Sequence, residues 1–234
     1  MTAMNTKLEE SPLKNRLVGG VVVLLIVGAV ALLAYGIQVI RLALKNEQTH
    51  QDMRWIGIAL QRYHDQHGHF PPVVELDNRG SPMHSWRALI QPHLTAEVQT
   101  SDNFKAYDFN QRWDSATNSD AVHRHRFGDH WYQFLAVVGP HAAWSNEVTR
   151  KRSDFKDGLS DTILVIGVRD TGIGWNEPRD AEFDGQTLTI GGRPLDPSQP
   201  LFVLMADGSV RYGLTSETLA PLLTIDAGDA ATKW

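Results

Sequence analysis

A run of 24 residues without a charged side chain, residues 17–40, lies between Arg16 and Arg41. An α-helix of this length rises about 36 Å, which exceeds the roughly 30 Å hydrocarbon core of a bilayer. A cleaved secretory signal is the alternative, but its apolar region spans only about 7–15 residues. Ala29-Val30-Ala31 imitates a cleavage site, yet apolar residues continue past it. The run therefore predicts a retained transmembrane helix, with the membrane as a partner.

Charge alone leaves the orientation of this helix almost undecided. Three basic residues precede the run, and three more follow it within residues 41–54. The positive-inside rule counts Lys and Arg near the ends of a span, so the two sides nearly tie. Because Arg16 adjoins the run and the segment before it is short, we expect residues 1–16 to form a cytoplasmic tail. The rest of the chain is then extracytoplasmic.

The chain beyond this helix is acidic and free of cysteine. Residues 47–234 carry 17 basic and 25 acidic side chains. This balance argues against nucleic acid as a partner, because a nucleic-acid-binding surface is basic. The absence of cysteine excludes disulfides, thiolate nucleophiles and cysteine metal sites.

Residues 41–67 are predicted to continue the helix with one apolar face. The apolar residues of this face recur at spacings of three and four: Met53, Ile56, Leu60 and Tyr63. Gly68 fits a helix C-cap, and Pro71-Pro72 prevents the helix from resuming. The pattern predicts one long helix that is apolar all round in its first half and amphipathic in its second.

Strand patterns dominate the second half of the chain. Strands are expected at residues 131–138, 162–168 and 188–190. The strongest hairpin signal is an apolar run at 201–206, then Asp207-Gly208, then a strand at 209–212. Short helices are expected at 85–92, with Ser85 as N-cap, and at 216–223, whereas 95–125 is expected to be ordered but irregular. A helix followed by locally paired strands predicts an α+β fold with an antiparallel sheet.

Six short motifs follow one another along this part of the chain. They occupy residues 56–72, 85–87, 110–115, 157–164, 175–180 and 205–212. In this order they resemble a planctomycete family, the domain of unknown function numbered 1559, whose members look like type IV pilins and secretion pseudopilins. The resemblance covers residues 50–228. It implies a pilin-like fold with the long helix packed on the sheet.

Two features depart from the family pattern. Gly19-Gly20 is followed by Val21-Val22-Val23 instead of Phe-Thr-Leu-Val-Glu, and residues 17–40 contain no Glu. In pilins that intramembrane charge is retained for subunit docking, so its absence argues against pilus-like assembly. Pro197 also occupies a position where the family often has a histidine.

Carboxylates and histidines supply candidate metal ligands. Asp154, Asp157 and Asp161, or Asp180, Glu182 and Asp184, offer the oxygen ligands that Ca²⁺ prefers. Asp-Gly pairs also form turns without any ion, which is the simpler interpretation. His64, His67 and His69 are close in sequence, but the resemblance assigns His64 to the packed end of the helix. We therefore expect no metal or other cofactor, with calcium as the weak alternative.

The polar residues around Trp175 are the candidate binding surface. No nucleophile motif, phosphate loop or His-Glu-x-x-His is present, so we do not expect an enzyme. Glu177, Arg179 and Asp180 form either a salt-bridged loop or, with Trp175, a surface for a ligand. A ligand-binding module or enzyme at residues 175–180 is therefore the alternative function.

These observations predict a single-pass membrane protein with four parts. They are a cytoplasmic tail (1–16), a transmembrane helix (17–40), a pseudopilin-like extracytoplasmic domain (41–228) and a loose tail (229–234). The expected role is a structural or interaction protein of the cell envelope or of a secretion-type assembly. Its partners would be other envelope or secretion-system proteins.

Overall fold

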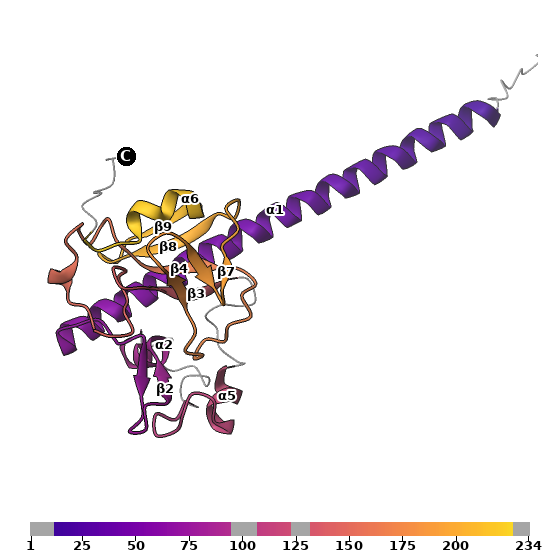
Figure 1. Cartoon of the computed structure of the whole chain (residues 1–234). Helices are drawn as coiled ribbons and strands as arrows, with labels where there is room; N and C mark the ends of the chain where they lie inside the picture. Colours follow the sequence, from indigo (N-terminus) through magenta and orange to yellow (C-terminus); the bar gives the residue numbers. More distant parts are fainter. Residues whose placement is uncertain (1–11, 95–106, 123–131, 227–234) are drawn as a thin grey trace, which may run out of the picture. The chain divides into compact units, whose positions relative to one another are not determined.

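A computed structural model describes residues 12–94, 107–122 and 132–226 of the chain (Figure 1). The chain divides into two compact units, residues 1–47 and 48–234, which are treated separately. Helix α1 (Pro12–His67) contributes residues to both, and this confirms the long helix predicted from the sequence. The expected loose tail at 229–234 lies outside the described residues, as do residues 1–11.

In the first unit, helix α1 is apolar on every side. Its large apolar side chains between Val21 and Leu44 are exposed, and Leu32 reaches 74%. A helix that is hydrophobic all round suits a lipid or protein interior better than water. Within the described residues, α1 is the one helix that is long and apolar enough to cross a membrane, judged by length and composition.

The second unit is built on a seven-stranded sheet of order β7-β6-β5-β3-β4-β8-β9. Its strands are β3 (Gln133–Val138), β4 (Ile163–Val168), β5 (Ala181–Phe183), β6 (Leu188–Ile190), β7 (Arg193–Pro194), β8 (Leu201–Met205) and β9 (Val210–Leu214). The continuous apolar run of β4 is buried at all six positions, as a central strand requires. The hairpin predicted around Asp207-Gly208 is confirmed as β8–β9.

The sheet is mixed, so the expectation of a purely antiparallel sheet was wrong at one pair. Strand β3 pairs antiparallel with β4 and parallel with β5. The reason is the connection after β4, residues 169–180, which crosses β3 before β5 begins. Strand β5 therefore lies beside β3 and runs in the same direction as β3, which is opposite to the direction of β4. Such a crossover is not signalled by local sequence.

Helix α1 packs on one face of this sheet through its predicted apolar face. Met53, Ile56 and Leu60 are fully buried. A Cβ at Gly57 would lie 2.9 Å from Leu204 Cδ1, so the helix approaches β8 closely there. Gln61 Nε2 then donates to the carbonyl of Ala206 at 2.8 Å. The amphipathic half of α1 is thus an integral layer of the second unit.

Smaller elements surround the sheet. A two-stranded sheet, β1 (Val74–Leu76) with β2 (Pro82–Ser85), leads into α2 (Trp86–Leu89) and the 3₁₀ turn η1 (Gln91–His93). Further elements are α5 (Ala116–Val122), η2 (Arg152–Asp154), α6 (Ser216–Leu219) and η3 (Ala220–Leu222). In Figure 1, α2, β2 and α5 gather on one side of the sheet, and α6 lies on the other near β9.

The predicted short helices exist but are divided. The helix expected at 85–92 is α2 followed by η1, and that expected at 216–223 is α6 followed by η3. Ser85 occupies the N-cap position of α2 but makes no side-chain capping bond, so that part of its predicted role was wrong. Helix α5 also interrupts the segment expected to be irregular at 95–125, of which residues 95–106 and 123–125 lie outside the described residues.

Both outer strands carry features that oppose pairing with another chain. Strand β7 is two residues long and ends in Pro194, which has no N–H to donate. In β9, Tyr212 pairs with Phe202 and Leu214 pairs with Leu201 of β8. Gly213, between them, has φ +91° and no paired residue, which makes a bulge. Such a bulge twists an edge strand out of line. The described sheet is therefore closed to simple strand addition at either edge.

The packing of α1 predicts a large loss of stability at one isoleucine and a small change at another on the same helix. Ile56 is fully buried, whereas Ile58 is 42% exposed. Ile56→Ala should lower the free energy of unfolding by about 2–5 kcal/mol, because it leaves a cavity against the sheet. Ile58→Ala should change it by less than about 1 kcal/mol. Urea titration of the full chain in detergent, followed by tryptophan fluorescence, measures both, and equal losses would contradict this packing.

Candidate functional site

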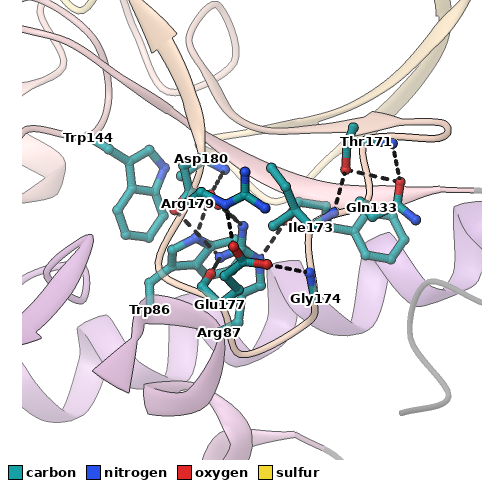
Figure 2. Close-up of polar contacts among 12 residues, drawn as sticks. Trp86, Arg87, Gln133, Trp144, Thr171, Ile173, Gly174, Glu177, Arg179 and Asp180 are labelled. Carbon is teal, nitrogen blue, oxygen red and sulfur yellow. Dashed lines mark hydrogen bonds and ion pairs between the residues drawn. The ribbon is translucent and has the colours of Figure 1, made fainter. Parts of the chain in front are cut away.

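Two sequence motifs that are far apart in the chain meet inside the second unit. Trp86 and Arg87 begin helix α2, and Asp180 ends the crossover loop just before β5. Arg87 Nη2 lies 2.7 Å from Asp180 Oδ1, and the two side chains are 1% and 3% exposed. Figure 2 shows this buried arginine–aspartate pair with the rings of Trp86 and Trp144 beside it.

All five N–H donors of Arg87 have acceptors. Its Nε donates to the Phe134 carbonyl at 2.8 Å. Its Nη1 donates to the Glu177 carbonyl at 3.3 Å and to Asp180 Oδ2 at 3.5 Å. Its Nη2 donates to the Arg179 carbonyl at 2.9 Å and to Asp180 Oδ1 at 2.7 Å. Because a guanidinium has five donors in a fixed fork, none is left for a ligand.

One carboxylate oxygen of Asp180 accepts three hydrogen bonds. Its Oδ1 accepts from Arg87, from Trp86 Nε1 at 3.1 Å and from the backbone N–H of Ala136 at 2.7 Å. Burial raises the pKa of the Asp180 carboxyl and lowers that of the Arg87 guanidinium, while their mutual attraction favours the charged form of each. Three donors aimed at one oxygen match a carboxylate, so the hydrogen bonds are those of an ion pair.

The crossover loop is fastened at further points. Gln133 Oε1 accepts the backbone N–H of Thr171 at 3.0 Å and its hydroxyl at 3.2 Å. Glu177 Oε2 accepts the N–H of Gly174 at 3.0 Å, and Oε1 of the same carboxylate pairs with Arg179 Nε. These contacts, drawn in Figure 2, fold the loop upon itself before it reaches β5.

A buried amide pair ties the same loop to the element after α2. Gln91 Nε2 in η1 donates to Asn176 Oδ1 at 2.8 Å, and both residues are at most 3% exposed. Together with Arg87, this contact connects the α2–η1 segment to the loop over two successive turns. The residues that hold the loop therefore come from about 90 positions earlier in the chain.

The four residues predicted to form a binding surface differ in exposure. Trp175 and Asp180 are buried. The side chains of Glu177 and Arg179 are 19% and 56% exposed and pair with each other. Contact of a ligand with the Trp175 ring would thus require the loop to move. The binding role of these residues stays a prediction.

The candidate calcium ligands serve separate turns. Asp154 Oδ2 accepts the N–H of Lys151 at 2.8 Å, Thr224 Oγ1 donates to Asp157 Oδ2 at 3.3 Å, and Ser160 Oγ donates to Asp161 Oδ2 at 3.2 Å. Asp180, from the second candidate set, is paired with Arg87. Within the described residues, no three or more His, Asp or Glu side chains are grouped so as to hold a metal ion.

The other motifs likewise supply internal contacts. The fully buried Asn118 side chain accepts the N–H of Asp108 at 2.8 Å and donates to three carbonyl oxygens at 2.9–3.0 Å, those of Asp108, Gln111 and Arg112. In the motif at 157–164, Thr162 Oγ1 donates to the carbonyl of Gly158 at 3.0 Å. These polar residues order loops that have little regular structure of their own.

Sequence reasoning missed Arg87 as the centre of the site. The Ser85-Trp86-Arg87 motif stood out, but nothing local indicated that the arginine would be buried or which carboxylate it would contact. An arginine next to a tryptophan at the start of a short helix is a weak signal by itself. Its guanidinium lies 4.9 Å from the Trp86 ring centre, which adds a cation–π contact.

Comparison with known proteins gives one family match. A family model described as "Protein of unknown function (DUF1559)" matches residues 46–138, a range that contains Trp86, Arg87 and β3. Asp180 lies beyond the matched range. No curated protein and no solved structure matches the chain.

The buried pair predicts a large cost for removing one partner. Arg87→Met leaves the buried Asp180 carboxylate without its positive partner and three backbone carbonyls without the guanidinium donor, and should lower the free energy of unfolding by about 3–5 kcal/mol. Arg179→Met removes a partly exposed arginine from the same loop and should cost less than about 1 kcal/mol. Urea titration compares the two variants.

A double variant separates the pair from general packing. Arg87→Met with Asp180→Leu should cost clearly less than the sum of the two single changes, because neither charge is then left unpaired. Strictly additive losses would contradict the direct coupling of these two side chains.

Proposed function

We propose that the chain is a single-pass membrane protein whose second unit is a pilin-like structural or interaction domain outside the cytoplasm. It would act in the cell envelope or in a secretion-type assembly. The observation that carries this proposal is the use of the motif residues: the buried charges of Arg87 and Asp180 hold the crossover loop. A catalytic site would instead leave such groups facing a substrate.

The anchor is supported by the two halves of α1. The first half carries exposed apolar side chains and no charge over residues 17–40. The second half buries one face on the sheet. The same order, an apolar segment followed by a segment packed on a sheet, is the arrangement that the resemblance to pilins implies.

The mode of assembly differs from that of a pilus in this proposal. The apolar segment has no acidic residue to dock a neighbouring subunit. Both sheet edges are also closed to strand addition. The segment therefore serves as a permanent tether, and the domain meets its partners through its loops and faces. Without a pilin-type docking charge, the protein would stay in the membrane instead of entering a filament.

The topology is testable because the natural chain contains no cysteine. Ser153 is exposed in the second unit, and Ser11 precedes the apolar segment. In intact cells of the native host, a membrane-impermeant maleimide should label Ser153→Cys and leave Ser11→Cys unlabelled. Permeabilised cells should show labelling of both. Labelling of Ser11→Cys alone in intact cells would reverse the orientation, and recovery of the chain in the soluble fraction would exclude the anchor.

The structural role is testable by isolating the protein from native membranes after cross-linking. A complex of defined stoichiometry is expected, and it should persist when the partly exposed loop pair is changed by Glu177→Ala with Arg179→Ala. A chain that is recovered only as a monomer would argue against an assembly role. A saturable small-molecule ligand that is lost in the double variant would favour the alternative function at residues 175–180.

A further inference from the structure

The end of helix α1 is joined to a neighbouring segment by a contact that requires a neutral histidine. His64 Nε2 lies 3.3 Å from the backbone nitrogen of Arg152, the first residue of η2. A backbone N–H can only donate, so His64 Nε2 must carry a lone pair. The imidazole in this contact is therefore unprotonated at Nε2, with its hydrogen on Nδ1.

The surroundings of His64 oppose its protonation. Its side chain is 12% exposed, and its ring faces Phe70 with centroids 5.0 Å apart. Three groups that can be charged face it: Arg152 from η2, Asp65 from its own helix and His69 from the following segment. Burial, and then Arg152, lower the pKa of His64, while the carboxylate of Asp65, 4.0 Å from Nδ1, acts in the opposite direction.

Arg152 and the residues around it join α1 to the C-terminal part of the chain. The Arg152 guanidinium binds Gln61 Oε1 and, at 2.7 Å, Asp65 Oδ1. The backbone N–H groups of Lys156 and Asp157 donate to the carbonyl of Ile225 at 2.6 and 3.0 Å. Residues 150–157, which we call the clamp segment, therefore bridge the end of α1 and the end of the described chain.

A second histidine lies against the same helix end. The His93 ring, in η1, lies 5.3 Å from Tyr63 and 6.0 Å from His67 between centroids. Arg62 Nη1 also donates to the His93 carbonyl at 3.0 Å. Burial, His67 and Arg62 all lower the pKa of His93. Two imidazoles at the end of α1, those of His64 and His93, therefore favour the neutral form.

We propose that the end of helix α1 is an acid-sensitive clamp, in which neutral His64 holds the clamp segment on the helix and protonation of His64 releases it. Protonation replaces the acceptor at Nε2 with a second donor opposite the Arg152 N–H. It also places a positive charge beside the Arg152 guanidinium. The same event leaves the β3–β4–β8 core untouched, because His64 makes no hydrogen bond to those strands within the described residues.

The direction with pH follows from linkage. The pKa of His64 is lower in the closed state than its ordinary value of about 6.5, so the open state binds the proton more readily. The contact contributes fully above that ordinary value. It is lost progressively as the pH falls from there through the lower pKa of the closed state.

Hydrogen–deuterium exchange of the full chain in lipid nanodiscs tests the clamp. After correction for the chemical exchange rate, the protection of residues 152–157 should fall at least about threefold between pH about 7.5 and about 5.5. The protection of β4 should stay constant over the same interval. Unchanged protection of the clamp segment would overturn the proposal, as would an equal fall throughout the second unit.

A matched pair of variants assigns the effect to His64. His64→Gln places an amide oxygen near Nε2, accepts the same N–H and does not titrate, so it should abolish the pH dependence. His141→Gln changes an exposed histidine, paired with Asp226 at 3.1 Å, and should leave the dependence intact. If His64→Gln keeps the full dependence, the proposal fails.

A measurement on the unmodified chain covers the case in which His64→Gln does not fold. Nuclear magnetic resonance titration should show the Arg152 amide shifting with the same midpoint as the His64 ring. A His64 ring that titrates with no change at the Arg152 amide would overturn the proposal.

Discussion

The second unit depends on one buried charge pair. The Arg87 guanidinium fixes the crossover loop by donating to the backbone carbonyls of Glu177 and Arg179 and to the Asp180 carboxylate. That carboxylate in turn accepts the N–H of Ala136 in β3. Burying two charges is unfavourable unless every donor and acceptor is matched, which this geometry achieves. The pair thereby sets where the loop ends and β5 begins, and β6 and β7 follow from that position.

The sequence predicted well what local periodicity determines. The spacing of Met53, Ile56 and Leu60 gave the buried face of α1, and Asp207-Gly208 gave the β8–β9 hairpin. It did not predict the parallel β3–β5 pair, because that pair depends on a contact between residues 87 and 180. The polar residues around Trp175 were recognised as a group, but the partner of Asp180 was not among them.

The same limit applies to the candidate metal ligands. Asp154, Asp157 and Asp161 are near each other in sequence, and a sequence cannot tell whether such carboxylates converge on a point or serve neighbouring turns. Here each has its own hydrogen-bonding donor. The histidines illustrate the same limit, because the backbone N–H of Arg152 that donates to His64 Nε2 could be identified only from the fold.

The features at the two sheet edges have a further consequence under the proposed membrane tether. Confinement to two dimensions raises the local concentration of identical domains far above that in free solution. At such concentrations, an open edge strand would recruit its copies into a growing ladder. Pro194 and the bulge at Gly213 remove that route. On such a surface, copies of the domain would then collide without joining edge to edge into a continuous sheet.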